Sequence, residues 1–157
     1  MASVAFFLHH QRPEAVELTR HAANWLLAEG HEVRLPGTDA RHADLAHLAC
    51  RDEELTTGLD VAVSLGGDGT MLRTVDLVGD DRIPVIGVNL GHLGYLAEVE
   101  PQHLCPSLRR FFAGDHQVQE RMRLRVTVDV FSSTGTGPTS YPALNEAVLG
   151  KTPTGQM

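Results

Sequence analysis

A glycine-rich turn contains the residues of this sequence that are best suited to chemistry. It consists of Gly66, Gly67, Asp68, Gly69 and Thr70. The turn follows an apolar run at 60–65 (DVAVSL) and precedes a stretch with helical spacing at 71–78. A turn of this kind lies at the carboxyl edge of a parallel sheet, where α/β folds bind ligands. Glycines allow positive φ and a close approach of N–H groups to a phosphate, and the helix N-terminus favours the same anion. We therefore expect a phosphate site here.

Asp68 is unusual in a phosphate-binding turn, because a carboxylate repels phosphate oxygens unless a cation or a transferable proton intervenes. We interpret Asp68 either as the acceptor of a proton from an attacking hydroxyl or as a partner of Mg²⁺. A weak base suffices for phosphoryl transfer, since the hydroxyl needs orientation more than deprotonation. The alternative is a tight turn in which Asp68 only caps the helix. The P-loop lysine of G-x-x-x-x-G-K-[ST] is missing, which argues against a P-loop nucleoside triphosphatase.

The elements around this turn alternate between strand and helix, which predicts an α/β fold: a doubly wound, Rossmann-like parallel sheet. Apolar runs predict strands at 3–9, 31–35, 60–65 and 83–88. Helical spacing predicts helices at 14–29 and 71–78, the first with Pro13 in its first turn and Gly30 at its end. The polar stretch 36–58 has weaker periodicity, and we expect a helix at 44–55.

The character of the sequence changes near residue 100. A helix is expected at 102–112, followed by a two-residue alternation of apolar and polar residues at 122–130 and a further strand at 145–149. We therefore expect two domains. Residues 1–100 form the α/β nucleotide-binding domain, and residues 101–157 form the first, incomplete part of an all-β domain.

Composition narrows the classes of partner. Thirteen basic and twenty acidic residues give a net charge of −7, which disfavours nucleic acid and anionic membrane surfaces. No apolar stretch is long enough to span a bilayer, and no signal peptide is evident. Cys50 and Cys105 have no metal-binding spacing, so we expect a reduced, cytoplasmic protein. The nine histidines show no spacing that predicts a zinc site.

Three motifs together resemble NAD kinases, which share a superfamily with diacylglycerol kinases and phosphofructokinases. They are GGDGT followed by MLR at 66–73, NLGHLGYL at 89–96 and ALNE at 143–146. The resemblance implies transfer of the γ-phosphoryl of ATP, or of polyphosphate, to the 2′-hydroxyl of the adenosine ribose of NAD to give NADP. It also implies a divalent ion such as Mg²⁺ and a homo-oligomer that binds neither nucleic acid nor membrane.

The resemblance also implies roles for individual residues. Asp68 would be the proton acceptor, with Gly66, Gly67, Gly69 and Thr70 around the substrates. Gly69 and Arg73 would contact NAD, although for Arg73 an exposed helix arginine is the alternative. Asn145 and Glu146 would hold the adenosine or its ribose hydroxyls, or else form an exposed loop pair. Tyr95 could stack on a base or serve as a core aromatic residue.

The carboxyl-terminal part departs from the family pattern. A later family segment, Thr-Pro-Thr-Gly-Ser-Thr-Ala-Tyr, is echoed only by TPTG at 152–155, much closer to Glu146 than in the family. We therefore assign no binding role to 152–155 and expect weak or no turnover from these 157 residues alone. A non-catalytic nucleotide-binding relative is the alternative. A lipid kinase of the same superfamily is disfavoured by the Asn-Glu pair and by the lack of a basic membrane-facing patch.

Overall fold

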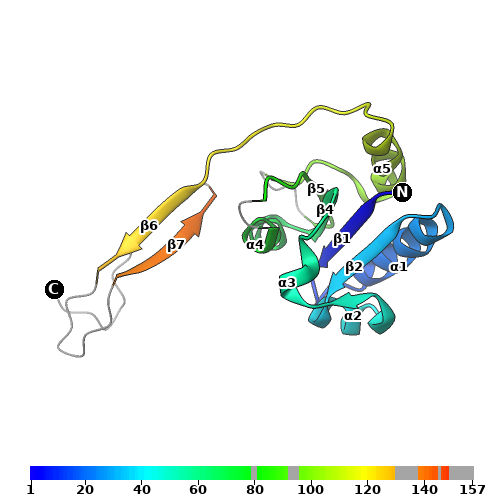
Figure 1. The fold of residues 1–157 in the computed structure, drawn as a ribbon, viewed down its shortest axis with the longest axis horizontal. Helices are drawn as coiled ribbons and strands as arrows, with labels where there is room; N and C mark the ends of the chain where they lie inside the picture. Colours follow the sequence, from blue (N-terminus) through cyan, green and yellow to red (C-terminus); the bar gives the residue numbers. More distant parts are fainter. Residues whose placement is uncertain (79–80, 92–95, 130–137, 145, 149–157) are drawn as a thin grey trace. The chain divides into compact units, whose positions relative to one another are not determined.

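The computed structural model describes residues 1–78, 81–91, 96–129, 138–144 and 146–148. Two compact units are present, Met1–Val118 and Gln119–Met157. Each is described by itself below (Figure 1).

The first unit is built on a parallel sheet. Its strands are β1 (Ser3–Leu8), β2 (Glu32–Pro36), β3 (Ala49–Cys50), β4 (Val61–Gly66) and β5 (Val85–Asn89). Their spatial order is β3-β2-β1-β4-β5, and all pairs are parallel. Successive side chains of β1 enter two different apolar clusters, with Phe6 in one and Phe7 in the other. Because both faces of the sheet are covered, the strands are continuous apolar runs, as predicted.

Helices cover the two faces unequally. They are α1 (Pro13–Ala28), α2 (Gly37–His42), α3 (Asp52–Leu55), α4 (Asp68–Val78) and α5 (Leu104–Phe112), with short 3-10 turns η1 (Ala46–Leu48) and η2 (Pro101–His103). Buried residues of α1, α2 and α5 belong to the larger cluster, and those of α3 and α4 include members of the smaller one. Figure 1 shows α1 and α4 on opposite sides of the sheet. The sheet is therefore doubly wound, as the sequence predicts.

The strand order reverses between β1 and β4. From β1 the chain proceeds outward to β2 and β3, and from β4 it proceeds outward to β5. The carboxyl ends of β1 and β4 therefore form the switch point of the sheet, where doubly wound folds bind ligands. The glycine-rich turn follows β4 directly and therefore lies at this edge.

The prediction of one helix at 44–55 is wrong. Helix α2 ends at His42, and the chain then forms the turn η1, the two-residue strand β3 and the four-residue helix α3. Asp44 has φ 53°, a left-handed conformation that ends α2 and cannot continue a helix. The compact unit also extends past the boundary expected at residue 100, because Leu104 and Leu108 of α5 are buried in its larger cluster.

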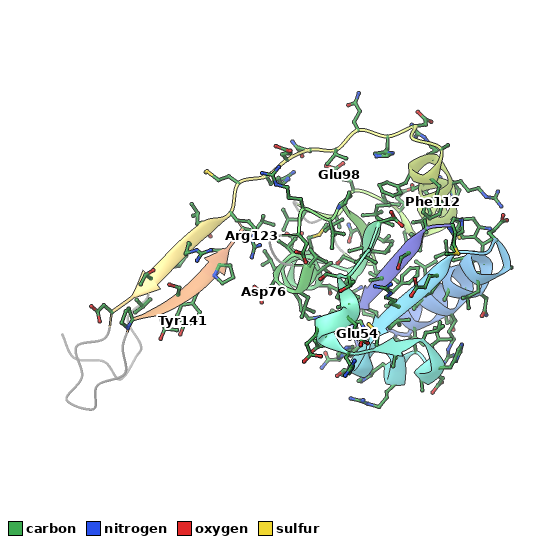
Figure 2. The ribbon with its side chains drawn as sticks, in the orientation of Figure 1. Glu54, Asp76, Glu98, Phe112, Arg123 and Tyr141 are labelled. Carbon is green, nitrogen blue, oxygen red and sulfur yellow. The ribbon has the colours of Figure 1, made fainter. Side chains whose placement is uncertain are left out.

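The second unit contains an antiparallel pair, β6 (Leu124–Val128) and β7 (Thr139–Ala143), joined in register from Leu124 opposite Ala143 to Val128 opposite Thr139. The alternating pattern at 122–130 correctly predicts β6. The strand expected at 145–149 is wrong in its described part, since residues 146–148 lie in no strand and the partner is β7. Tyr141, labelled on β7 in Figure 2, is exposed.

Candidate functional site

The turn after β4 is tied to its neighbours by backbone hydrogen bonds. The carbonyl of Gly66 accepts the N–H of Leu90 at 3.1 Å, which extends the β4–β5 pairing past the strand ends. The carbonyl of Gly67 accepts the N–H groups of Thr70 and Met71 at 3.0 and 3.1 Å. Helix α4 therefore begins at Asp68, three residues earlier than the sequence predicts, and Asp68 lies in its first turn.

The three glycines of the turn serve two different purposes. A Cβ at Gly66 would overlap Thr70 Oγ1 and lie 2.8 Å from Thr70 Cβ, so a side chain is excluded there. A Cβ at Gly67 or Gly69 would meet no atom within 4 Å. None of the three has a positive φ, so the expectation that they supply left-handed geometry is wrong. Gly66 allows α4 to pack on the strand end, and Gly67 and Gly69 leave the backbone open to approach.

The carboxylate of Asp68 lies between two segments of the chain. Asp68 is half-buried, and its Oδ1 accepts the backbone N–H of Leu96 at 3.1 Å. Leu96 follows β5, so this bond joins the first turn of α4 to the segment after the next strand. The carboxylate is thus held at the carboxyl edge of the sheet, at the positive end of a helix that favours negative charge.

Thr70 packs inward. The residue is 7% exposed, its hydroxyl lies against Gly66, and its N–H is bonded to Gly67. Its carbonyl accepts the hydroxyl of Thr74 at 2.8 Å. The side chain of Thr70 therefore fixes the start of α4 against β4.

Arg73 belongs to a partly buried cluster that the sequence analysis missed. Its Nη2 is paired with Asp39 Oδ2, and its Nη1 lies 3.3 Å from His10 Nε2. The alternative of a simple exposed arginine is therefore wrong. His10 follows β1 and Asp39 follows β2, so the signal that could have found both is their position just after predicted strand ends. The three side chains come together at the same sheet edge as the turn, because parallel strands share that edge.

The start of the motif at 89–96 shapes the neighbouring turn. Asn89 Oδ1 accepts the N–H of Gly91 at 3.0 Å, and the Arg12 guanidinium donates to the carbonyl of Leu90. A Cβ at Gly91 would lie 2.7 Å from Arg12 Nη2, so glycine makes room for this arginine. Arg12 thereby links the loop after β1 to the loop after β5, on either side of β4.

The described structure does not test the placement of three predicted site residues. Tyr95 and Asn145 lie outside the described residues. Glu146 is exposed and belongs to the second unit. Their roles remain predictions.

Other candidate binding features lie away from the turn. A shallow hollow of about 440 Å³ is lined by parts of β2, β3 and α3, including Cys50. Another, of about 360 Å³, lies beside His10 and the start of α1. Burial raises the pKa of the Cys50 thiol, as it does for Cys105. Among the described residues, no group of three or more His, Cys, Asp or Glu side chains could hold a metal ion. No helix in that part of the chain is long and apolar enough to cross a membrane.

Comparison with known proteins connects this geometry to a family. A family model described as the ATP-NAD kinase N-terminal domain matches residues 4–116. The chain belongs to the NAD kinase family. The matched residues cover nearly all of the first unit, including the turn at 66–70 and the cluster around Asp39. The resemblance drawn from the three sequence motifs is thereby confirmed.

Curated NAD kinases are similar over most of this chain. The enzyme of Heliobacterium modesticaldum is 40% identical over 152 residues, which are 96% of this chain and 52% of the relative. That of Geotalea daltonii is 38% identical over 128 residues, 82% of this chain and 45% of the relative. The chain therefore spans about half the length of the curated NAD kinases that it matches.

Two solved structures share the fold. Yeast NADH kinase complexed with NADH has a TM-score of 0.76 at 17% identity, covering 91% of this chain and 46% of the yeast chain. An NAD kinase from Archaeoglobus fulgidus in complex with ATP has a TM-score of 0.51 at 22% identity, covering 80% and 40%. At these identities the likeness concerns the α/β fold of the family, which agrees with the predicted fold class.

Proposed function

We propose that the protein containing this chain is an NAD kinase, which transfers the γ-phosphoryl of ATP, or a phosphoryl of polyphosphate, to the 2′-hydroxyl of the adenosine ribose of NAD. The observation that carries the proposal is the placement of Asp68. A half-buried carboxylate lies in the first turn of α4, at the strand-order switch, between two glycines whose backbone is open to approach. The names of the curated relatives support the same reaction.

The reaction assigned to this geometry uses few groups. The 2′-oxygen attacks the γ-phosphorus, the bond from that phosphorus to the β–γ bridging oxygen breaks, and ADP leaves. Asp68 orients the hydroxyl and accepts its proton. The open backbone at Gly67 and Gly69 and the N-terminus of α4 favour the phosphate oxygens, which carry the charge in a loose transition state.

A divalent ion fits this arrangement as a companion of the donor phosphates. Mg²⁺ is usually held by one or two carboxylates together with substrate phosphates, and Asp68 would provide a carboxylate only as the alternative to its role as proton acceptor. When bound, the ion would neutralise charge on the phosphate oxygens. The first unit would thus need no metal site whose ligands all come from the protein.

The remaining substrate contacts are proposed from the family motifs. Asn145 and Glu146 hold the adenosine or its ribose hydroxyls, Tyr95 stacks on a base, and Arg73 contacts NAD. Thr70 contributes by fixing the start of α4. The proposed enzyme is a cytoplasmic homo-oligomer.

The test measures the formation of NADP by two variants of the protein, each with one substitution in α4. Asp68→Asn preserves the shape of the side chain and removes the proton acceptor, so turnover should fall about 100- to 10,000-fold while ATP binding stays within about twofold. Asp76→Asn, on the exposed side of α4 and labelled in Figure 2, should keep the wild-type rate. NADP is measured with a dehydrogenase that does not accept NAD. A wild-type rate for Asp68→Asn would refute the role of the base, and binding of ATP without any NADP from the unmodified protein would favour a non-catalytic relative.

A further inference from the structure

Asp39 is a buried carboxylate with three donors around it. It lies in α2, is 1% exposed, and its Oδ2 accepts the backbone N–H of Leu8 at 2.9 Å. The same oxygen is paired with Arg73 Nη2, and Oδ1 lies 2.7 Å from His10 Nε2. The carboxylate therefore joins the end of β1, the helix after β2 and the helix after β4.

The geometry fixes which atom of His10 carries a proton. Arg73 can only donate, and Asp39 can only accept when ionised. If Nε2 of His10 were bare, its lone pair would face the carboxylate at 2.7 Å; Nε2 therefore donates to Asp39 Oδ1. Arg73 Nη1 lies 3.3 Å from the same nitrogen. Both His10 and Arg73 therefore donate to the carboxylate of Asp39. His42 stacks on the His10 ring at 4.1 Å, with 7° between the planes, and keeps the ring in this orientation.

The cluster has more donors than acceptors. Both oxygens of Asp39 are occupied, whereas the side chain of Arg73 is 36% exposed and that of His10 is 28% exposed. The Nε of Arg73 is buried and has no hydrogen-bond partner among the described residues, so the donors that a ligand could reach are on the Nη atoms. Surplus N–H donors on a fixed guanidinium match the oxygens of a phosphate.

Stability alone gives a weak reason for such a cluster. Removing a carboxylate and a guanidinium from water is costly, and apolar side chains of similar volume often stabilise a fold equally well. The cluster lies at the sheet edge used by the proposed active site, and Arg73 is on the same helix as Asp68. A buried charge at this place is better explained by what it positions.

We propose that Asp39 is a positioning residue, which holds Arg73 beside His10 so that the remaining N–H donors of the guanidinium face a substrate phosphate. This inference rests on the proposed function, and it deepens that function by assigning the phosphate contact to a preorganised guanidinium. The phosphate belongs either to the polyphosphate chain of the donor or to the pyrophosphate of NAD.

The test measures binding of two probes to the 157-residue chain by calorimetry, with inorganic tripolyphosphate for the donor and NAD for the acceptor. Asp39→Asn should weaken one of the two probes about tenfold and change the other less than twofold, which identifies the source of the phosphate. The matched control is Asp44→Asn. Asp44 is 81% exposed and pairs with Arg20 at the surface, so both affinities should remain unchanged.

A double-mutant cycle separates positioning from a merely structural role. If Asp39 acts through Arg73, then Asp39→Asn should cost less than twofold in binding when Arg73→Ala is already present. The Nε–H resonance of Arg73 should also broaden in Asp39→Asn as the guanidinium becomes mobile. Independent, fully additive losses and an unchanged resonance would overturn the inference.

Three further outcomes keep the inference distinct from the proposed function. If Asp39→Asn does not fold, Arg73→Lys leaves Asp39 with a cation and should still weaken the same probe, because lysine lacks the planar fork; unaltered affinity would overturn the inference. If the unmodified chain binds a probe and Asp39→Asn binds it equally well, only the positioning role fails. If the unmodified chain binds neither probe, the inference fails, and the proposed function is still decided by the formation of NADP in the whole protein.

Discussion

Two carboxylates with different surroundings lie at the carboxyl edge of the β1–β4 pair. Asp68 is half-buried in the first turn of α4, where one oxygen accepts a backbone N–H. Asp39 is fully buried and has a cation and two further donors as partners. The first is the proposed proton acceptor, and the second holds its neighbours in place. Only the first was predictable from sequence, because Asp68 stands in a recognisable turn and Asp39 does not.

The open glycines lead to a prediction at the residue scale. Gly67→Ala and Gly69→Ala should leave the free energy of unfolding within about 1 kcal/mol of the unmodified chain, because the new Cβ meets no atom and φ is not left-handed. Both should weaken tripolyphosphate binding, since the methyl group lies where the phosphate approaches. Urea unfolding and calorimetry measure the two effects. Unchanged binding in both variants would show that phosphate does not approach this backbone.

The cysteines give a prediction about reactivity. Burial raises the pKa of the Cys50 thiol, only partly offset by the nearby Arg34, and burial also raises the pKa of Cys105. Both thiols should therefore stay protonated at neutral pH and become reactive only at a pH above the ordinary thiol range. Alkylation by iodoacetamide at pH 7 should be slower in the folded chain than in urea. Faster labelling of the folded chain would contradict the assigned burial.

At the scale of elements, the junction between β4 and α4 depends on one glycine. Gly66→Ala would force a methyl group onto the hydroxyl and Cβ of Thr70, with His9 Cβ 3.2 Å away. Overpacking of this kind should lower the free energy of unfolding by about 1–3 kcal/mol. Urea unfolding checks the value, with Gly67→Ala as the neighbouring control. Equal stability of the two variants would show that α4 does not pack on the strand end as described.

Elements were predictable from sequence in proportion to their length. The buried strands are apolar runs, and α1 spans sixteen residues between Pro13 and a glycine with φ 80°. Between 37 and 58 the elements are only two to six residues long, too short to show a period. That stretch contains Asp39, whose partners His10 and Arg73 are 29 and 34 positions away along the chain. No local pattern connects residues at such separations, so the cluster was found only in the folded chain.

At the scale of the whole molecule, the first unit should fold without the second. Its core includes Leu104 and Leu108 of α5, which are fully buried. A chain of residues 1–118 should therefore unfold cooperatively in urea, whereas residues 1–100 should lose this transition, since the larger cluster would be uncovered. Cooperative unfolding of residues 1–100 with the same midpoint would contradict the place given to α5.

The family and the fold class were predictable from three motifs and the alternation of elements, and the comparisons confirm both. The roles of Tyr95, Asn145 and Glu146 stay predictions. They depend on residues outside the described structure or on the second unit, and the α/β unit says nothing about them.

The most direct measurement of the central claim is a titration of the ¹⁵N-labelled chain with Mg²⁺ and ATP, followed through its backbone amide resonances. The account predicts that the largest shifts fall on Gly67, Asp68 and Gly69, with a smaller response at Arg73. The account would be contradicted if the shifts were concentrated in the hollow around Leu48 and Cys50 and the resonances of the turn after β4 did not move.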